Sequence, residues 1–246
     1  MSERLRSLLF AMALCVVCSL LLTAAATGLK GYQQRNMLAD RQKNILAAAQ
    51  LISMEEKLTP QQIQAQFSQQ IKTFYVDDTG SIMPPDKQTP SDLPIYLVLS
   101  DNETIEAYVV PIDTTGLWGK IHGYLAFEAD GKTVRGFTVY KHSETPGLGG
   151  EIEKRWFQEN FEGKKITNAQ GDFVSIKIAK GQVQDGQNGD KKDNTVDGIS
   201  GATLTGKYLT AGLEDILQDY EPVAVKFRNR NVGKVTLGDA EEKSEP

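Results

Sequence analysis

Residues 121–142 read "IHGYLAFEADGKTVRGFTVYKH", and this stretch predicts the centre of the fold. Strand-forming residues lie on both sides of Asp130-Gly131, a pattern typical of two strands joined by a type I′ turn. Two further strand-like runs, 95–100 and 104–112, precede this hairpin and flank a turn at Asp101-Asn102. An antiparallel sheet is therefore expected through this part of the chain.

Helical patterns surround the predicted strands. Apolar residues recur at helical intervals over 32–58, and a second helix is expected to begin after Thr59. Thr59 suits an N-cap, Pro60 suits the first turn, and Gln62 completes a capping box. This second helix has apolar positions at Ile63, Phe67 and Ile71.

The second half of the chain mixes both kinds of element. Residues 151–161 predict a short helix, and the spacing of apolar residues over 209–217 predicts a longer one. Residues 174–180 and 222–229 read as strands, the latter as the last strand of the chain. Because strands and helices do not alternate regularly, the pattern favours an α+β fold over a parallel α/β fold.

The N-terminal region contains an uncharged apolar run over residues 8–29. This length is sufficient to cross a hydrocarbon core of about 30 Å, and it exceeds the usual apolar core of a signal peptide. We therefore expect a retained single transmembrane helix, with a cleaved signal as the alternative. Cys15 and Cys18 lie inside this run, where they are expected to act as small apolar packing residues.

Several function classes fit the sequence poorly. The net charge of −5, without a basic stripe, argues against nucleic acid as a partner. His122 and His142 are the only histidines, and both fall on predicted strands or their ends. Ala202 departs from the nucleophile-elbow pattern of hydrolases. The acidic loop containing Asp185, Asp190, Asp193 and Asp197 lacks calcium-loop spacing, so we expect no metal-binding residues. Because the histidines and Ala202 do not fit hydrolase chemistry, we expect no catalytic residues either.

Two glycine-rich stretches remain as candidate sites. Residues 196–206, "VDGISGATLTG", lead into the predicted helix at 209–217, and helix N-termini bind phosphate groups well. Simple N-capping by Ser or Thr is the alternative. Residues 142–156, "HSETPGLGGEIEKRW", form either a tight turn or a loop whose backbone lies against a flat or anionic ligand.

Together these stretches resemble a known family. "DGISGATLT" (197–205) resembles the flavinylation motif of FMN-binding domains, and "ETPGLGGEI" (144–152) resembles their companion motif. With the apolar N-terminus and "GLWG" (116–119), the chain is similar to the C subunits of the sodium-translocating NADH:quinone oxidoreductases. The related G subunits of Rnf-type ferredoxin:NAD oxidoreductases share both motifs and stay an alternative, as does a flavin-free, membrane-anchored scaffold domain.

The resemblance implies FMN bound covalently, through a phosphoester to Thr205, in a protein that relays electrons between redox centres of a membrane complex. Its expected partners are the other subunits of the sodium-transporting complex, membrane lipid, and a flavin transferase that uses FAD and magnesium. The implied location is the bacterial inner membrane, with the FMN domain on the periplasmic face. Further cofactor-binding residues implied by the resemblance are Ser200, Gly201, Ala202, Thr203, Leu204, Glu144, Thr145 and Leu148.

Lys180 is added on physical grounds, because a cation near the ring would stabilise reduced, anionic flavin. An exposed lysine at a strand end, without contact to a cofactor, is the alternative. The expected organisation is a cytoplasmic N-terminus (1–7), a transmembrane helix (8–29), a helical connecting region (30–93), an FMN-binding domain (94–232) and a polar tail (233–246).

Overall fold

The computed structural model describes residues 2–100, 102, 104–183 and 192–230, and it divides into two units after Asp40. The predicted tail at 233–246 lies outside the described residues. So do Asp101 of the predicted turn and Asp185 and Asp190 of the acidic loop.

The first unit contains most of helix α1 (Glu3–Ala48). Its apolar side chains are exposed over 8–29, and the helix is long and apolar enough to cross a membrane by length and composition. Cys15 and Cys18 are both unpaired and exposed along this helix. These observations agree with the predicted membrane anchor.

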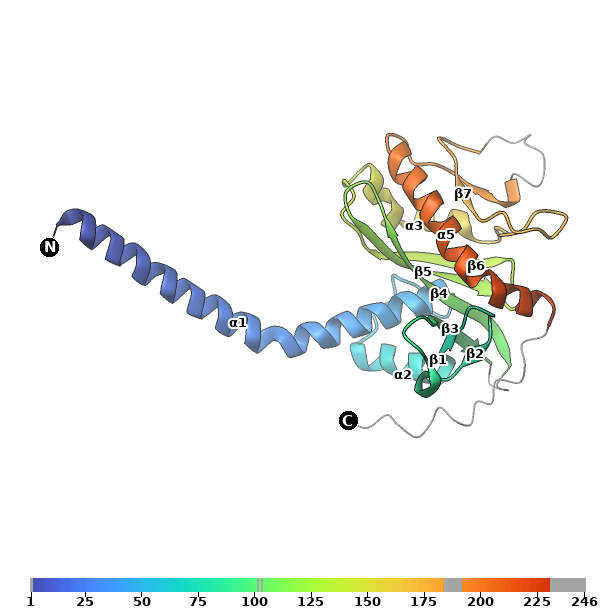
Figure 1. Cartoon of the computed structure of the whole chain (residues 1–246), viewed down its shortest axis with the longest axis horizontal. Helices are drawn as coiled ribbons and strands as arrows, with labels where there is room; N and C mark the ends of the chain where they lie inside the picture. The colour runs from blue at the N-terminus through green and yellow to red at the C-terminus, as the bar shows by residue number, and fades with distance from the viewer. Residues whose placement is uncertain (1, 101, 103, 184–191, 231–246) are drawn as a thin grey trace. The chain divides into compact units, whose positions relative to one another are not determined.

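The second unit is built on a six-stranded antiparallel sheet (Figure 1). The β4–β5 hairpin is its longest pairing, running from Ala107 opposite Glu128 to Thr115 opposite Lys120. The order β2-β1-β3-β4-β5-β6 is formed by β1 (Ile71–Val76), β2 (Ile82–Met83), β3 (Leu93–Leu99), β4 (Ile105–Thr115), β5 (Lys120–Glu128) and β6 (Val134–Lys141).

Each face of this sheet is buried under helices. One hydrophobic cluster joins the sheet to α5 (Thr203–Arg228), with Leu125 and Phe127 packed with Leu209 and Leu213. A second cluster joins the opposite face to the end of α1 and to α2, with Leu46 packed near Val109. The remaining elements are α2 (Pro60–Gln70), η1 (Pro85–Lys87), η2 (Gly149–Glu153), α3 (Arg155–Gln158), η3 (Glu159–Phe161), β7 (Lys177–Ile178) and β8 (Thr195–Val196). The predicted α+β class is confirmed.

Local signals predicted α2 well but missed its end. The Thr59–Gln62 capping box and Pro60 in the first turn are all present. Ile71, however, begins β1 rather than continuing the helix. β1 and β2 therefore lie in the segment 30–93, where the sequence predicts only a helical connecting region.

The prediction of a type I′ turn at Asp130-Gly131 is wrong. A type I′ turn needs positive φ at both central residues, and here only Gly131 has it, at 68°. The Asp130 carboxylate instead accepts hydrogen bonds from the backbone N–H groups of Lys132 (2.9 Å) and Thr133 (2.8 Å). These bonds stabilise a longer loop between β5 and β6.

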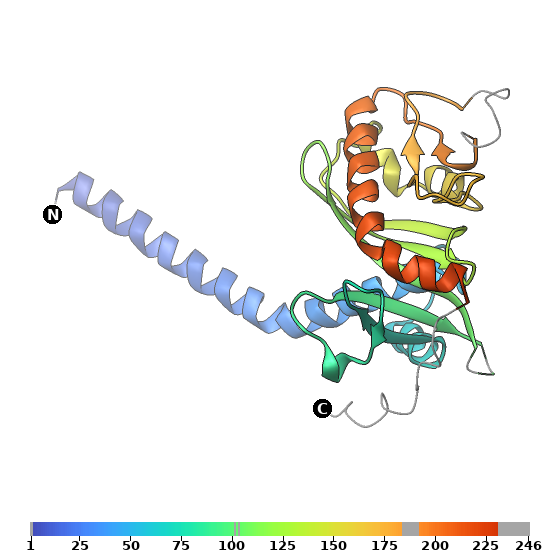
Figure 2. The same ribbon diagram turned by 45° about the vertical axis from the view of Figure 1, so that its right-hand side comes forward.

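The strand predicted at 222–229 is also wrong, because α5 continues to Arg228. Val223, Ala224 and Phe227 are buried, and their spacing fits one face of a helix. Pro222 lies inside the helix, and Figure 2 shows that α5 bends toward its C-terminal end. The strand expected over 174–180 is reduced to β7, which pairs in parallel with β8, a strand that the sequence did not predict.

Two buried tyrosines provide a matched test of this core. Tyr220 donates a 2.7 Å hydrogen bond to the carbonyl of Pro94, whereas the buried Tyr108 hydroxyl has no partner among the described residues. We expect Tyr220→Phe to lower the free energy of unfolding by about 1 kcal/mol, and Tyr108→Phe to leave it unchanged or raise it. Urea denaturation of the detergent-solubilised chain, followed by circular dichroism, measures both. Equal losses in the two variants would contradict the assignment of the Tyr220 bond.

Candidate functional site

Three segments far apart in the sequence meet at the carboxylate of Glu144. Its Oε1 accepts a 2.9 Å hydrogen bond from the backbone N–H of Trp118, in the turn between β4 and β5. Its Oε2 accepts a 2.5 Å hydrogen bond from the hydroxyl of Thr205, in the first turn of α5. Glu144 itself follows β6, so the structure brings the two glycine-rich motifs into direct contact.

Both partners in this contact are buried. Glu144 is 4% exposed and Thr205 is 1% exposed. A buried carboxylate is costly unless hydrogen bonds replace its water, and here a hydroxyl and a backbone N–H do so. Sequence reasoning named both residues, but it did not predict that they bind each other.

Glycines allow this close approach. A Cβ on Gly149 would lie 2.5 Å from Thr205 Oγ1 and 2.7 Å from Glu144 Oε2. A Cβ on Gly116 would lie 2.5 Å from Glu144 Oε1. A residue with a side chain at either position would therefore collide with the pair. Gly201 has a φ of 75°, which favours glycine, and it lies against the side chain of Leu148.

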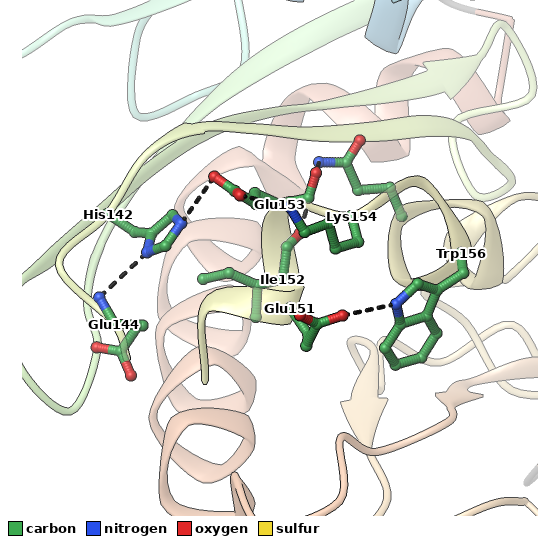
Figure 3. Close-up of polar contacts among 8 residues, drawn as sticks. His142, Glu144, Glu151, Ile152, Glu153, Lys154 and Trp156 are labelled. Atoms are coloured by element: carbon green, nitrogen blue, oxygen red, sulfur yellow. Dashed lines mark hydrogen bonds and ion pairs between the residues drawn. The ribbon is translucent and has the colours of Figure 1, made fainter. Parts of the chain in front are cut away.

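His142 binds the backbone of Glu144, a contact that sequence reasoning missed. Figure 3 shows its ring between Glu144 and Glu153. Nδ1 accepts the backbone N–H of Glu144 at 3.1 Å, so in the neutral ring Nε2 carries the proton toward Glu153 Oε2, also at 3.1 Å. Hydrogen bonds from Lys154 and then His142 hold the pKa of Glu153 below its usual value. The only sequence signal was a histidine two positions before Glu144.

The start of α5 is not closed by a capping side chain. Its N-cap residue is Ala202, which makes no side-chain capping hydrogen bond to the described residues. Ser200 and Thr203 are exposed, and Thr205 is turned to Glu144 instead. N-capping by Ser or Thr, the alternative explanation of this stretch, is therefore wrong, and the dipole end of a long helix remains available to an anion.

The other predicted residues lie at the surface of this region. Leu148 and Leu204 are exposed, as are Trp118 and Tyr208, neither of which was predicted as a cofactor-binding residue. Thr145 is exposed, and its carbonyl accepts the N–H groups of Leu148 (3.1 Å) and Gly150 (2.9 Å). Lys180 is exposed just after β7, in a segment that runs beside Gly198.

These features suit a ligand with a flat apolar ring and a phosphate. Exposed apolar side chains can cover a ring, and the start of α5 can accept a phosphate. The hydroxyl of Thr205 is buried and bonded to Glu144, and Gly149 packs beside it. Two surface hollows of the described domain lie elsewhere, one near Lys132 and Arg228 and one near Asp77 and Pro222.

Comparison with known proteins identifies the class of protein as one with an FMN-binding domain. Residues 116–218 match the FMN-binding domain family, and this range contains all three segments of the site. The chain is 35% identical over 229 residues to the C subunit of the Na(+)-translocating NADH-quinone reductase of Yersinia pestis, covering 81% of this chain and 83% of that protein. It is 33% identical to the corresponding protein of Pseudomonas aeruginosa, over 86% and 89% of the two chains.

Solved structures agree with this assignment. The crystal structure of the corresponding protein from Parabacteroides distasonis superposes with a TM-score of 0.67 at 26% identity, covering 80% of this chain and 96% of that one. NqrC of Shewanella oneidensis gives a TM-score of 0.62 at 25% identity, over 81% and 98%. The chain belongs to the NqrC family, the C subunits of the Na(+)-translocating NADH-quinone reductases.

Gly149→Ala tests the packing of the Glu144–Thr205 pair. The added methyl group would collide with both oxygens, and we expect the free energy of unfolding to fall by about 1–3 kcal/mol. Gly181→Ala is the matched control, because nothing lies within 4 Å of its added Cβ, and its effect should stay below about 0.5 kcal/mol. Urea denaturation of both variants compares them. A Gly149→Ala variant as stable as the control would contradict the close packing.

Proposed function

We propose that this chain carries FMN joined to Thr205 through a phosphoester, and that it relays electrons between redox centres of a sodium-translocating NADH-quinone reductase. The observation that carries the proposal is the direct contact between the two motifs at Thr205 and Glu144, beside an uncapped helix start. Membership of the NqrC family and the match of residues 116–218 to the FMN-binding domain support it.

The residues at the site divide the work of holding this cofactor. Thr205 would bear the phosphate, and the backbone N–H groups at the start of α5 would offset its charge. Exposed Leu148, Leu204 and Trp118 would shield the ring. FMN supplies one- and two-electron transfer when bound, so no side chain of this site needs to act as a general acid or base in electron relay.

The apolar helix α1 bears on the location of this electron carrier in the cell. We propose that it anchors the chain in the inner membrane, with the FMN domain on the periplasmic face and in contact with other subunits of the complex. A flavin outside the cytoplasm cannot be replaced from the soluble pool, and a covalent bond prevents its loss. The names of the curated relatives favour this complex over an Rnf-type complex, which would reveal itself by different co-purifying subunits.

Thr205→Ala tests the covalent attachment. The full chain is co-expressed with a flavin transferase, and a denaturing gel is viewed under ultraviolet light. We expect a flavin-fluorescent band in the wild type and in Thr205→Ser, and none in Thr205→Ala, because only a hydroxyl at this position can form the ester.

Thr210→Ala is the matched control, since Thr210 lies in the same helix but its hydroxyl donates a 2.8 Å hydrogen bond to the carbonyl of Gly206 rather than to Glu144. It should keep the fluorescent band. Fluorescence that persists in Thr205→Ala would disprove the acceptor, and a wild type without fluorescence would favour a flavin-free scaffold.

A further inference from the structure

The hydroxyl of Thr205 is in contact with a base before any cofactor is attached. Its 2.5 Å distance to Glu144 Oε2 is at the short end for a hydroxyl and a carboxylate. A threonine hydroxyl is a weak nucleophile unless a neighbouring group takes its proton as it attacks. Glu144 Oε2 accepts a hydrogen bond from the Thr205 hydroxyl, so it is in position to take that proton.

We propose that Glu144 is the general base that activates Thr205 for its own flavinylation, an inference that rests on the proposed function. Thr205 Oγ1 attacks the FMN phosphorus of FAD, and its proton passes to Glu144 Oε2. The Oγ1–phosphorus bond forms while the phosphoanhydride bond to the adenylate breaks, and AMP leaves with the bonding electron pair. The acceptor protein thus contributes a catalytic group to its own modification by the flavin transferase.

The surroundings of Glu144 favour this role. The Trp118 N–H holds Oε1, which leaves Oε2 for the Thr205 hydroxyl. The carboxylate is 4% exposed, so little water competes for the proton. His142 is the nearby alternative base, but both of its ring nitrogens are already engaged, with the Glu144 backbone and with Glu153.

The transferred proton has a second use in the product. Once Thr205 is esterified it can no longer donate a hydrogen bond, and an ionised Glu144 would face a phosphodiester anion. A protonated Glu144 instead donates a hydrogen bond to an oxygen of that group. A glutamine at this position can still donate an N–H hydrogen bond, but it cannot act as a base. Glu144→Gln should therefore slow attachment of the cofactor without weakening its retention.

The test uses the full-length chain, produced without a flavin transferase and solubilised in detergent. It is mixed with purified transferase, FAD and Mg²⁺, and the time course of covalent fluorescence is measured at several concentrations of the chain. We expect E144Q to lower the kcat of attachment by about 10²-fold or more, with an unchanged KM for the chain. Long incubation should still give full labelling, and E144D should recover part of the lost rate.

Glu151→Gln is the matched control, because Glu151 lies in the neighbouring helix η2 and accepts a hydrogen bond from Trp156 rather than Thr205. It should be labelled at the wild-type rate. Wild-type kcat in E144Q, or a raised KM without a fall in kcat, would overturn the role of Glu144 and leave the proposed function intact. An unlabelled wild type, or label in Thr205→Ala, would instead overturn the proposed function. If E144Q does not fold, E144D decides: a lower kcat supports the base, and a wild-type kcat overturns it.

Discussion

The hydrogen bond from Thr205 to Glu144 spans 61 positions of the sequence and joins the two motifs inside the protein. Because both side chains are buried, loss of either one would leave its partner without a replacement from water. Such an unpaired buried group costs more than the bond itself contributes, so each motif has to be placed accurately against the other. Much of the local structure can be understood as meeting this requirement.

The sheet and α5 position the two motifs so that Glu144 and Thr205 come into contact. β6 ends at Lys141 and leads directly into His142 and Glu144, while the β4–β5 hairpin carries the Trp118 N–H. A Cβ on Gly212 would lie 1.7 Å from Thr114 Oγ1, so α5 can pack this closely on β4 only because position 212 carries no side chain. This contact lies about two helical turns after Thr205, so it helps to position the start of α5 beside the sheet.

The Thr59–Gln62 capping box could be predicted because it depends only on contacts within one helical turn. The Asp130-Gly131 turn is equally local, but its type was predicted wrongly. The strand predicted at 222–229 failed because packing on the sheet extends α5 past a strand-like alternation of residues. At the site, resemblance to flavinylation motifs predicted Glu144 and Thr205, yet no spacing could reveal their mutual hydrogen bond, which depends on the tertiary fold. The contact of His142 with the Glu144 backbone was missed for the same reason, since a strand-end histidine has no distinctive pattern in the chain.

Charge balance explains why an acidic residue can serve beside a phosphate. Two unit charges about 4 Å apart repel by about 4 kcal/mol at an effective dielectric constant of about 20. The positive end of α5 offsets only about 0.3–2 kcal/mol of such a term. A site with both an ionised Glu144 and a phosphodiester on Thr205 would therefore be strained. If the proton of the Thr205 hydroxyl stays on Glu144, the esterified site has the same net charge as the phosphodiester alone, and the carboxyl group changes from acceptor to donor in place. The buried, water-poor contact that lets Glu144 remove the proton also keeps that proton where the product needs it.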